Sequence, residues 1–270
     1  MNLHDPRPIG IFDSGVGGLT VLQALLRRFP HENFIYLGDT ARVPYGSKSA
    51  RTVERYTIQV ADFLLRRGVK ALVVACNTAS ALGLAALRAH TATPALGVIV
   101  PGCRMALAHS QPGETIGVIG TRSTIASGAY PHTLSLLDPT VKTFSLPCPL
   151  FVPLAEEGWV RHPATRLIVA ESLESFRQNP PAALILGCTH YPLLIPAIRE
   201  TMGEGVRLVD SAEAVAEELS LRFQDVIPPA PPDHARQVAL MVTDVADRFR
   251  EVAARFLDGF NVDEVEMVDL

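Results

Sequence analysis

Residues 71–80 read ALVVACNTAS, in which five apolar residues run directly into Cys76 and small polar residues follow. This order predicts a buried strand that ends at Cys76, with a helix over residues 81–87 shortly after it. Residues 183–192, ALILGCTHYP, repeat the order around Cys188. The unit of strand, cysteine, polar residues and helix therefore occurs twice, and this repeat decides the fold class that we predict.

Both cysteines are expected at the carboxyl end of a strand. Ligands of an open parallel sheet bind outside the carboxyl ends of its strands, so a cysteine there faces the ligand. The free N–H groups at the start of the next helix favour a thiolate, and such a site lowers the usual thiol pKa of ~8.5 by roughly one unit or more. We therefore predict a reactive sulfur at Cys76 and at Cys188. The alternative is that each is a small buried apolar residue.

The composition is that of a globular protein large enough for two domains. The chain has 270 residues, of which 48% are hydrophobic and 19% are charged. A net charge of −4 without a basic stripe argues against nucleic acid or an anionic membrane as a principal partner. No apolar stretch is long enough to predict a membrane span, and the first residues do not resemble a signal peptide. The four cysteines form no C-x-x-C pair, so we expect reduced thiols and a cytoplasmic location.

A second pair of matching segments indicates two similar halves. Residues 9–12 predict a strand that ends at Asp13, and the turn DSGVGG leads into a helix over residues 19–29. Residues 115–124, TIGVIGTRST, parallel this unit. Thr20 stands where a dinucleotide-binding fingerprint needs its third glycine, so the turn predicts at most a site for a small anion. Two units repeated in the same order predict a duplicated α/β protein.

We predict two α/β domains, residues 1–97 plus 210–270 and residues 98–209. Each has a mostly parallel sheet flanked by helices, and the site lies in the cleft between them. Further strands are expected at residues 34–37, 96–100, 206–209, 238–243 and 262–268. Further helices are expected at residues 49–67, 161–176, 192–202, 210–223 and 245–257. Residues 146–158 predict a loop that runs into a short helix, and residues 227–233, IPPAPPD, a stiff connector.

Two thiols that face each other across a cleft suit inversion at a carbon acid. One thiolate removes a proton from one face of the carbon, and the other thiol delivers a proton to the opposite face. Asp13, Glu156 and His190 are candidates for tuning the two sulfurs. Hydroxyl and amide groups at helix starts are candidates for holding a carboxylate, namely Ser14, Asn77, Thr78, Thr121 and Thr189.

Some of these residues have a purely structural interpretation. A single histidine after a strand, such as His190, is often only a hydrogen-bonding residue. Glu156 stands beside Glu157, and an exposed carboxylate is the default expectation for such a pair. Cys103 and Cys148 lack the context of a strand end before a helix, and we interpret both as packing residues.

Seven segments between residues 9 and 212 together resemble the glutamate racemase family. They are IGIFDSGVGGLTVL, YLGDTARVPYG, VVACNTASA, GVIGTRSTI, CPLFVPLAEEG, LILGCTHYPLL and VDSA. The resemblance implies two α/β domains with the site between them. It implies an enzyme without a cofactor or metal that interconverts L- and D-glutamate and supplies D-glutamate for bacterial peptidoglycan. The connector near Pro229 lies outside the family pattern.

The resemblance also implies roles for individual residues. Cys76 would work on the D-isomer and Cys188 on the L-isomer, with Asp13, Glu156 and His190 in support. The substrate-binding residues that it implies are Asp13, Ser14, Pro44, Tyr45, Gly46, Asn77, Thr78, Thr121, Thr189 and His190. Members of the family form homodimers in more than one way, so a homodimer is the expected assembly.

Four other functions remain open from the sequence. A racemase of aspartate or another amino acid would use the same two thiols. A metal hydrolase could use Cys76, Cys188 and His190 as ligands, although no C-x-x-C or H-x-x-x-H spacing favours it. A dithiol redox protein would need Cα atoms of the two cysteines within about 7 Å of each other. An amino-acid binding protein would hold glutamate without exchanging its α-hydrogen.

Overall fold

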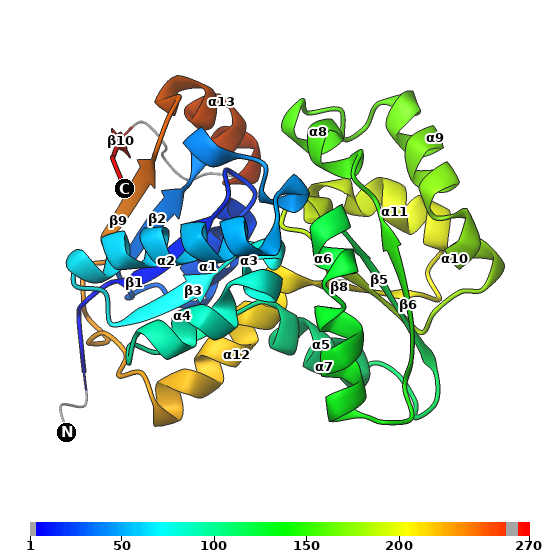
Figure 1. Ribbon diagram of the computed structural model, residues 1–270, viewed down its shortest axis with the longest axis horizontal. Helices are drawn as coiled ribbons and strands as arrows, with labels where there is room; N and C mark the ends of the chain where they lie inside the picture. Colours follow the sequence, from blue (N-terminus) through cyan, green and yellow to red (C-terminus); the bar gives the residue numbers. More distant parts are fainter. Residues whose placement is uncertain (1–3, 258–263) are drawn as a thin grey trace.

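The computed structural model describes residues 4–257 and 264–270. It contains two parallel sheets (Figure 1). The first sheet has the strand order β10-β9-β2-β1-β3-β4 and the second the order β6-β5-β7-β8. The first contains β1 (Ile9–Asp13), β2 (Phe34–Gly38), β3 (Ala71–Val74), β4 (Ala95–Gly97), β9 (Val238–Val242) and β10 (Val265–Met267). The second contains β5 (Thr115–Gly120), β6 (Lys142–Pro147), β7 (Ala183–Gly187) and β8 (Arg207–Asp210). All paired strands are parallel, so the predicted fold class of two α/β domains is confirmed.

Helices cover both faces of each sheet, because buried strand residues alternate between two apolar clusters. Ile9 and Ile11 of β1 face one cluster, and Phe12 faces the other. Beside the first sheet lie α1 (Leu19–Arg28), α2 (Ala50–Arg66), α3 (Asn77–Leu82), α4 (Leu84–His90), α12 (Ser211–Asp225) and α13 (Ala246–Phe256). Beside the second lie α5 (Ile99–Ala108), α6 (Arg122–Ala126), α7 (Ala129–Leu137), α8 (Phe151–Glu156), α9 (Pro163–Ser172), α10 (Glu174–Gln178) and α11 (Ile195–Met202). Short 3-10 turns occupy η1 (Thr40–Arg42), η2 (Tyr45–Ser47) and η3 (Tyr191–Leu194).

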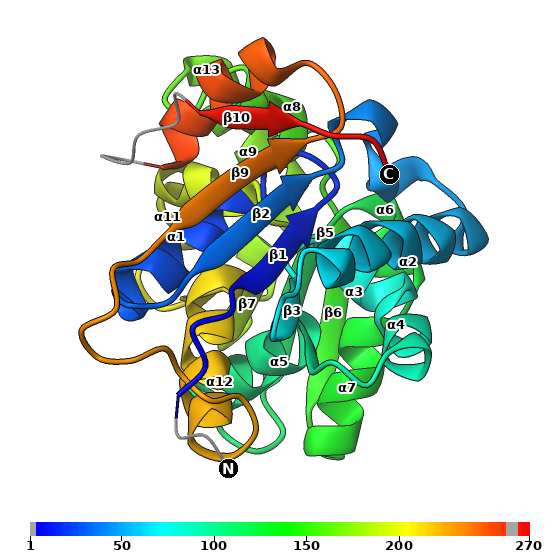
Figure 2. The same ribbon diagram turned by 90° about the vertical axis from the view of Figure 1, so that its left-hand side faces the viewer.

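One apolar cluster continues from the first sheet into the second. It contains Ile11 of β1 together with Val118 of β5 and Ile185 of β7. Helix α12 packs against α1 of the first domain and α5 of the second; Figure 1 shows it running toward the second domain, and Figure 2 shows it beside α5. The two domains therefore share part of their core. The predicted domain boundaries at residues 97 and 210 stay a prediction.

Several local predictions differ from the structure. The strand predicted over residues 96–100 ends at Gly97, and α5 starts at Ile99 with Pro101 in its first turn, where a missing N–H costs no hydrogen bond. Lys142–Pro147, where the sequence predicts no strand, forms β6 at the edge of the second sheet. The helices predicted over 81–87 and 161–176 are each replaced by two shorter ones. Of the strand predicted over 262–268, Val265–Met267 is observed, and residues 262–263 lie outside the described residues.

A buried ion pair holds the proline-rich connector. Lys70 Nζ lies 2.7 Å from Glu32 Oε2, and the two side chains are 1% and 4% exposed. Lys70 also donates to the carbonyls of Asp5 and Pro228, while Glu32 accepts from the N–H of Ala230. Burial lowers the pKa of Lys70, and the contact with Glu32 offsets part of that shift. These bonds fix the N-terminal segment, the start of β3 and the connector that leads to β9.

Replacing Lys70 by methionine should destabilise the protein by about 3 kcal/mol, because the Glu32 carboxylate would stay buried without its cation. Urea unfolding followed by circular dichroism measures the effect. The double variant Lys70→Met/Glu32→Leu should recover most of the loss, and Lys142→Met on an exposed strand should cost little. A Lys70→Met protein as stable as the wild type would show that the pair does not hold the connector.

Candidate active site

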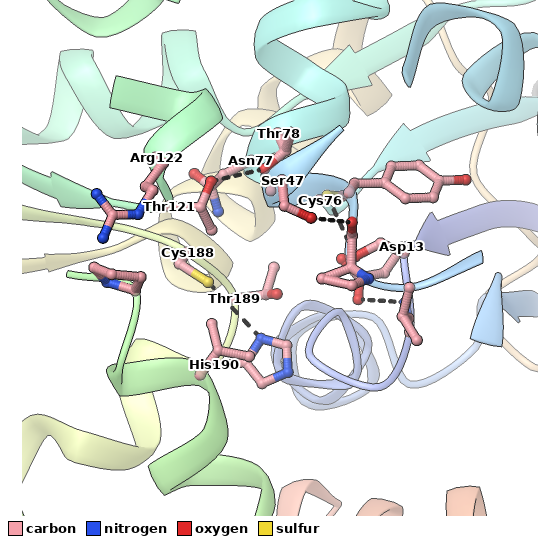
Figure 3. Close-up of a pocket in the computed structure, with 18 of the residues that line it drawn as sticks. Asp13, Ser47, Cys76, Asn77, Thr78, Thr121, Arg122, Cys188, Thr189 and His190 are labelled. Atoms are coloured by element: carbon pink, nitrogen blue, oxygen red, sulfur yellow. Dashed lines mark hydrogen bonds between the residues drawn. The ribbon is translucent and has the colours of Figure 1, made fainter. Parts of the chain in front are cut away.

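A cavity of about 370 Å³ lies where the carboxyl ends of the two sheets meet (Figure 3). All the residues that the sequence analysis assigns to the site line it: Asp13, Ser14, Pro44, Tyr45, Gly46, Cys76, Asn77, Thr78, Thr121, Glu156, Cys188, Thr189 and His190. Cys76 and Cys188 enter the cavity from different sheets, after β3 and β7 respectively (Figure 3). The structure therefore brings the predicted residues together, whereas their individual roles remain predictions.

Cys76 is the N-cap residue of α3. Its sulfur accepts a hydrogen bond from the N–H of Ala79 over 3.4 Å and donates to Ser14 Oγ over 3.8 Å. Burial raises the pKa of the Cys76 thiol to about 12, and the nearby charge of Asp13 adds to the rise. The expectation of a lowered thiol pKa at this position is therefore wrong, because the loss of water outweighs the hydrogen bonds that favour the thiolate.

Cys188 stands at the start of a chain of polar contacts. Its sulfur lies 3.8 Å from His190 Nδ1, and His190 Nε2 lies 2.9 Å from Glu156 Oε1. Burial alone would lower the pKa of His190, but the contacts with Cys188 and Glu156 outweigh it and raise that pKa to about 10. The imidazole is therefore a cation at neutral pH, placed between a sulfur and a carboxylate. The two sulfurs thus differ in their surroundings.

Two buried polar atoms at the cavity have no hydrogen-bond partner among the described residues, Asp13 Oδ1 and Asn77 Nδ2. Asp13 Oδ2 accepts from the N–H of Gly15 over 3.1 Å. Asn77 Oδ1 accepts from the hydroxyl of Tyr130 over 2.6 Å, which fixes the amide so that its NH₂ group is free to donate. An unpaired buried acceptor and an unpaired buried donor are therefore available to a polar ligand.

Hydrogen bonds between the domains shape the cavity wall. Thr78 of the first domain lies 3.1 Å from Thr121 and 3.0 Å from Thr124 of the second, measured between hydroxyl oxygens. Ser123 Oγ donates to the carbonyl of Gly46 over 2.8 Å, which joins the η2 turn to α6. These contacts place residues from both domains within one enclosed space.

Sequence reasoning missed several residues that line the cavity. They are Gly15, Val43, Ser47, Arg122, Pro149, Val152 and Pro153. Ser47 and Arg122 directly follow the predicted residues Gly46 and Thr121, so their position in the sequence carried a usable signal. Pro149, Val152 and Pro153 carried none of that kind, because apolar residues around a helix start are typical of packing.

Residues 4–257 and 264–270 contain neither a cluster of metal-ligating side chains nor a membrane-spanning helix. Within this part of the chain, no three histidine, cysteine, aspartate or glutamate side chains are grouped so that they could hold a metal ion. None of its helices combines the length and the apolar character that a membrane span requires. The four cysteines are free, and Cys103 and Cys148 lie buried in apolar clusters, which agrees with their interpretation as packing residues.

Comparison with known proteins gives a consistent result. The family model described as Asp/Glu/Hydantoin racemase matches residues 12–219. The chain is 48% identical to a glutamate racemase of Geobacter metallireducens, over 94% of this chain and 93% of that protein. A crystal structure of a glutamate racemase isoform from Bacillus anthracis superposes with a TM-score of 0.94, at 39% identity over 99% of each chain. The glutamate racemase of Francisella tularensis in complex with D-glutamate gives 0.90, at 37% identity over 98% of each chain.

The surroundings of Cys76 predict an unusual alkylation profile. With a pKa of about 12, the thiolate fraction of Cys76 should rise roughly tenfold per pH unit from neutral pH upward, whereas a free thiol levels off above ~8.5. Asp13→Asn removes a negative charge and should lower the pKa, so alkylation at a given pH becomes faster. Ser14→Ala removes the hydroxyl, which can turn to donate to the thiolate once the sulfur has lost its proton, and should have the opposite effect. Iodoacetamide labelling of the Cys76 peptide, followed by mass spectrometry, measures both; equal rates in the three proteins would contradict this account.

Proposed function

The chain belongs to the Asp/Glu/Hydantoin racemase family and, within it, to the glutamate racemases, and on this basis we propose that it interconverts L- and D-glutamate with two thiols as acid and base. The observation that carries the thiol mechanism is that Cys76 and Cys188 line one cavity from two different sheets. Inversion of a carbon needs acid and base groups on opposite sides of it, and two strand ends that meet supply such an arrangement.

Each turnover moves one proton in and one proton out. From L-glutamate, the Cys188 thiolate takes the α-proton and becomes a thiol, and the C–H electron pair stays on the α-carbon. The Cys76 thiol then gives its proton to the opposite face and becomes a thiolate, which yields D-glutamate. The reverse reaction exchanges the roles of the two sulfurs. No electron leaves the substrate, so the reaction needs no oxidant or reductant.

The charges around the two sulfurs support this division of roles. A pKa of about 12 keeps Cys76 a thiol at neutral pH, which is the form that donates a proton. The His190 cation, 3.8 Å from the Cys188 sulfur, stabilises negative charge there. For the reverse reaction Cys76 must act as the base. The α-ammonium group of a bound amino acid would then bring a positive charge that offsets the cost of burying the thiolate.

The unpaired polar atoms suggest how glutamate is held. Asp13 Oδ1 is free to accept from the α-ammonium group, and Asn77 Nδ2 is free to donate to a carboxylate. The hydroxyls of Thr78, Thr121 and Thr189 line the same cavity. Donors aimed at a carboxylate stabilise the negative charge that spreads onto it when the α-proton leaves. Ser14 and the segment of Pro44, Tyr45 and Gly46 are proposed to complete the contacts with the substrate.

The same family membership supports a proposal for the wider role. We propose that the protein acts in the cytoplasm as a homodimer without a cofactor, and that its D-glutamate serves bacterial peptidoglycan synthesis. Glutamate is the principal partner in this proposal, and neither nucleic acid nor a membrane takes part.

Exchange of the α-hydrogen in heavy water tests the activity directly. Both glutamate enantiomers should take up deuterium at the α-carbon and converge on the racemic mixture, and aspartate should exchange far more slowly. Proton NMR and chiral chromatography measure the two processes. Activity should survive dialysis against a strong chelator, because the mechanism needs no metal. Tight binding of glutamate without exchange would instead indicate a binding protein, and faster exchange of aspartate would indicate an aspartate racemase.

Removing either sulfur should abolish racemization. Cys76→Ala and Cys188→Ala should each reduce kcat by at least about a thousandfold, which is within the range that acid–base groups contribute. Circular dichroism in the far ultraviolet should stay unchanged, because each change removes one atom at the wall of a cavity. Cys103→Ala, which alters a buried cysteine outside the cavity, is the matched control and should retain activity. Normal turnover in either of the first two variants would contradict the mechanism.

A further inference from the structure

Helix α13 belongs to the first domain but contacts the Glu156–His190 pair of the second. Two consecutive residues near its end make these contacts. Arg255 Nη1 donates to the backbone carbonyl of Glu156. The Phe256 ring meets the His190 ring edge-on, at 90° and with 5.7 Å between centroids. Neither Arg255 nor Phe256 lines the cavity that holds the two sulfurs.

Arg255 holds the backbone from which the Glu156 carboxylate extends. Glu156 is the last residue of α8, so its carbonyl has no partner within that helix. The positive charge of Arg255 is also favourable there, because the C-terminal end of a helix carries partial negative charge. The guanidinium lies over Gly158, where an added Cβ would stand 3.2 Å from Arg255 Nη1 and where φ is 72°. The left-handed conformation and this close approach both favour glycine there. Arg255 therefore packs directly on the end of α8.

Phe256 limits the freedom of the His190 ring. Phe256 is 2% exposed and His190 is 6% exposed, so both rings are enclosed by protein. On the loop before α1, a Cβ added at Gly17 would lie 2.5 Å from His190 Nδ1, so the backbone there also lies close against the imidazole. The Glu156 carboxylate holds the remaining ring nitrogen, 2.9 Å away. The ring is thus confined in the orientation that points Nδ1 at the Cys188 sulfur.

We propose that Arg255 and Phe256 are positioning residues for Cys188. They act through Glu156 and His190 and touch neither sulfur. Helix α13 thereby couples the first domain to the acid–base group of the second domain, in addition to covering one face of the first sheet. The effect on turnover rests on the proposed function, whereas the effect on the reactivity of Cys188 can be measured without substrate.

The test compares the two cysteines within one molecule. Arg255→Met should slow the alkylation of Cys188 by about tenfold relative to Cys76, because loss of one hydrogen bond to a charged donor misplaces the His190 cation. It should lower kcat for glutamate to a similar extent with little change in KM. Arg255→Lys keeps a donor near the Glu156 carbonyl and should recover part of both. Arg250→Met, on the same helix, loses a surface pair with Asp247 and should match the wild type.

Phe256→Leu is the second variant and should change the ratio of Cys188 to Cys76 alkylation in the same direction. An unchanged ratio in both Arg255→Met and Phe256→Leu would overturn the proposal. Equal acceleration of both cysteines would also overturn it, because that result indicates general loosening. A wild-type protein that does not racemize glutamate would refute the proposed function, while the alkylation ratio would still decide the role of α13.

Discussion

Burial of a thiolate removes its hydration. At Cys76 this loss costs more free energy than the N–H of Ala79 and the hydroxyl of Ser14, as donors to the thiolate, can offset. Because of this cost, the charges around each sulfur strongly influence whether it ionises. Around Cys188 a buried histidine is held as a cation by a carboxylate, so that sulfur has a positive neighbour, whereas the Asp13 carboxylate acts on Cys76 as a negative one. Two chemically identical side chains at equivalent strand ends are thereby made different by what surrounds them.

The two domains are joined differently on the two sides of the cavity. A continuous apolar cluster, with α5 and α12 within it, connects the sheets. At the cavity wall the contacts are hydrogen bonds among Thr78, Thr121 and Thr124, and between Ser123 and Gly46. Hydrogen bonds exchange with water at small net cost, whereas exposure of apolar surface is costly in proportion to its area. Any separation of the domains that admits a ligand is therefore easier on the hydrogen-bonded side.

The sequence was sufficient to predict the strands that carry Cys76 and Cys188, because a fully apolar run that ends in small polar residues has few other interpretations. It also identified residues that line the cavity, since strand ends and helix starts of parallel sheets converge on one edge. Strand β6 escaped prediction because an edge strand is only partly buried and Lys142–Pro147 lacks an apolar run. The sign of the pKa shift at Cys76 was also out of reach, because it depends on how completely the folded chain excludes water. Arg255 lies 99 positions along the chain from Glu156, and Phe256 lies about sixty-six positions from His190. No local sequence pattern signals contacts over such separations.

The first sheet draws its strands from both ends of the chain, with β9 paired to β2 across an interval of about two hundred residues. A ribosome delivers the segment up to β4 long before it delivers β9. Until then the outer edge of β2 has unpaired N–H and carbonyl groups, which can pair with another emerging polypeptide. The second sheet has no such gap, because its four strands follow one another directly in the chain. Completion of the first sheet therefore depends on β9, and a truncation that removes β9 leaves an unpaired strand edge at β2 rather than a smaller stable fold.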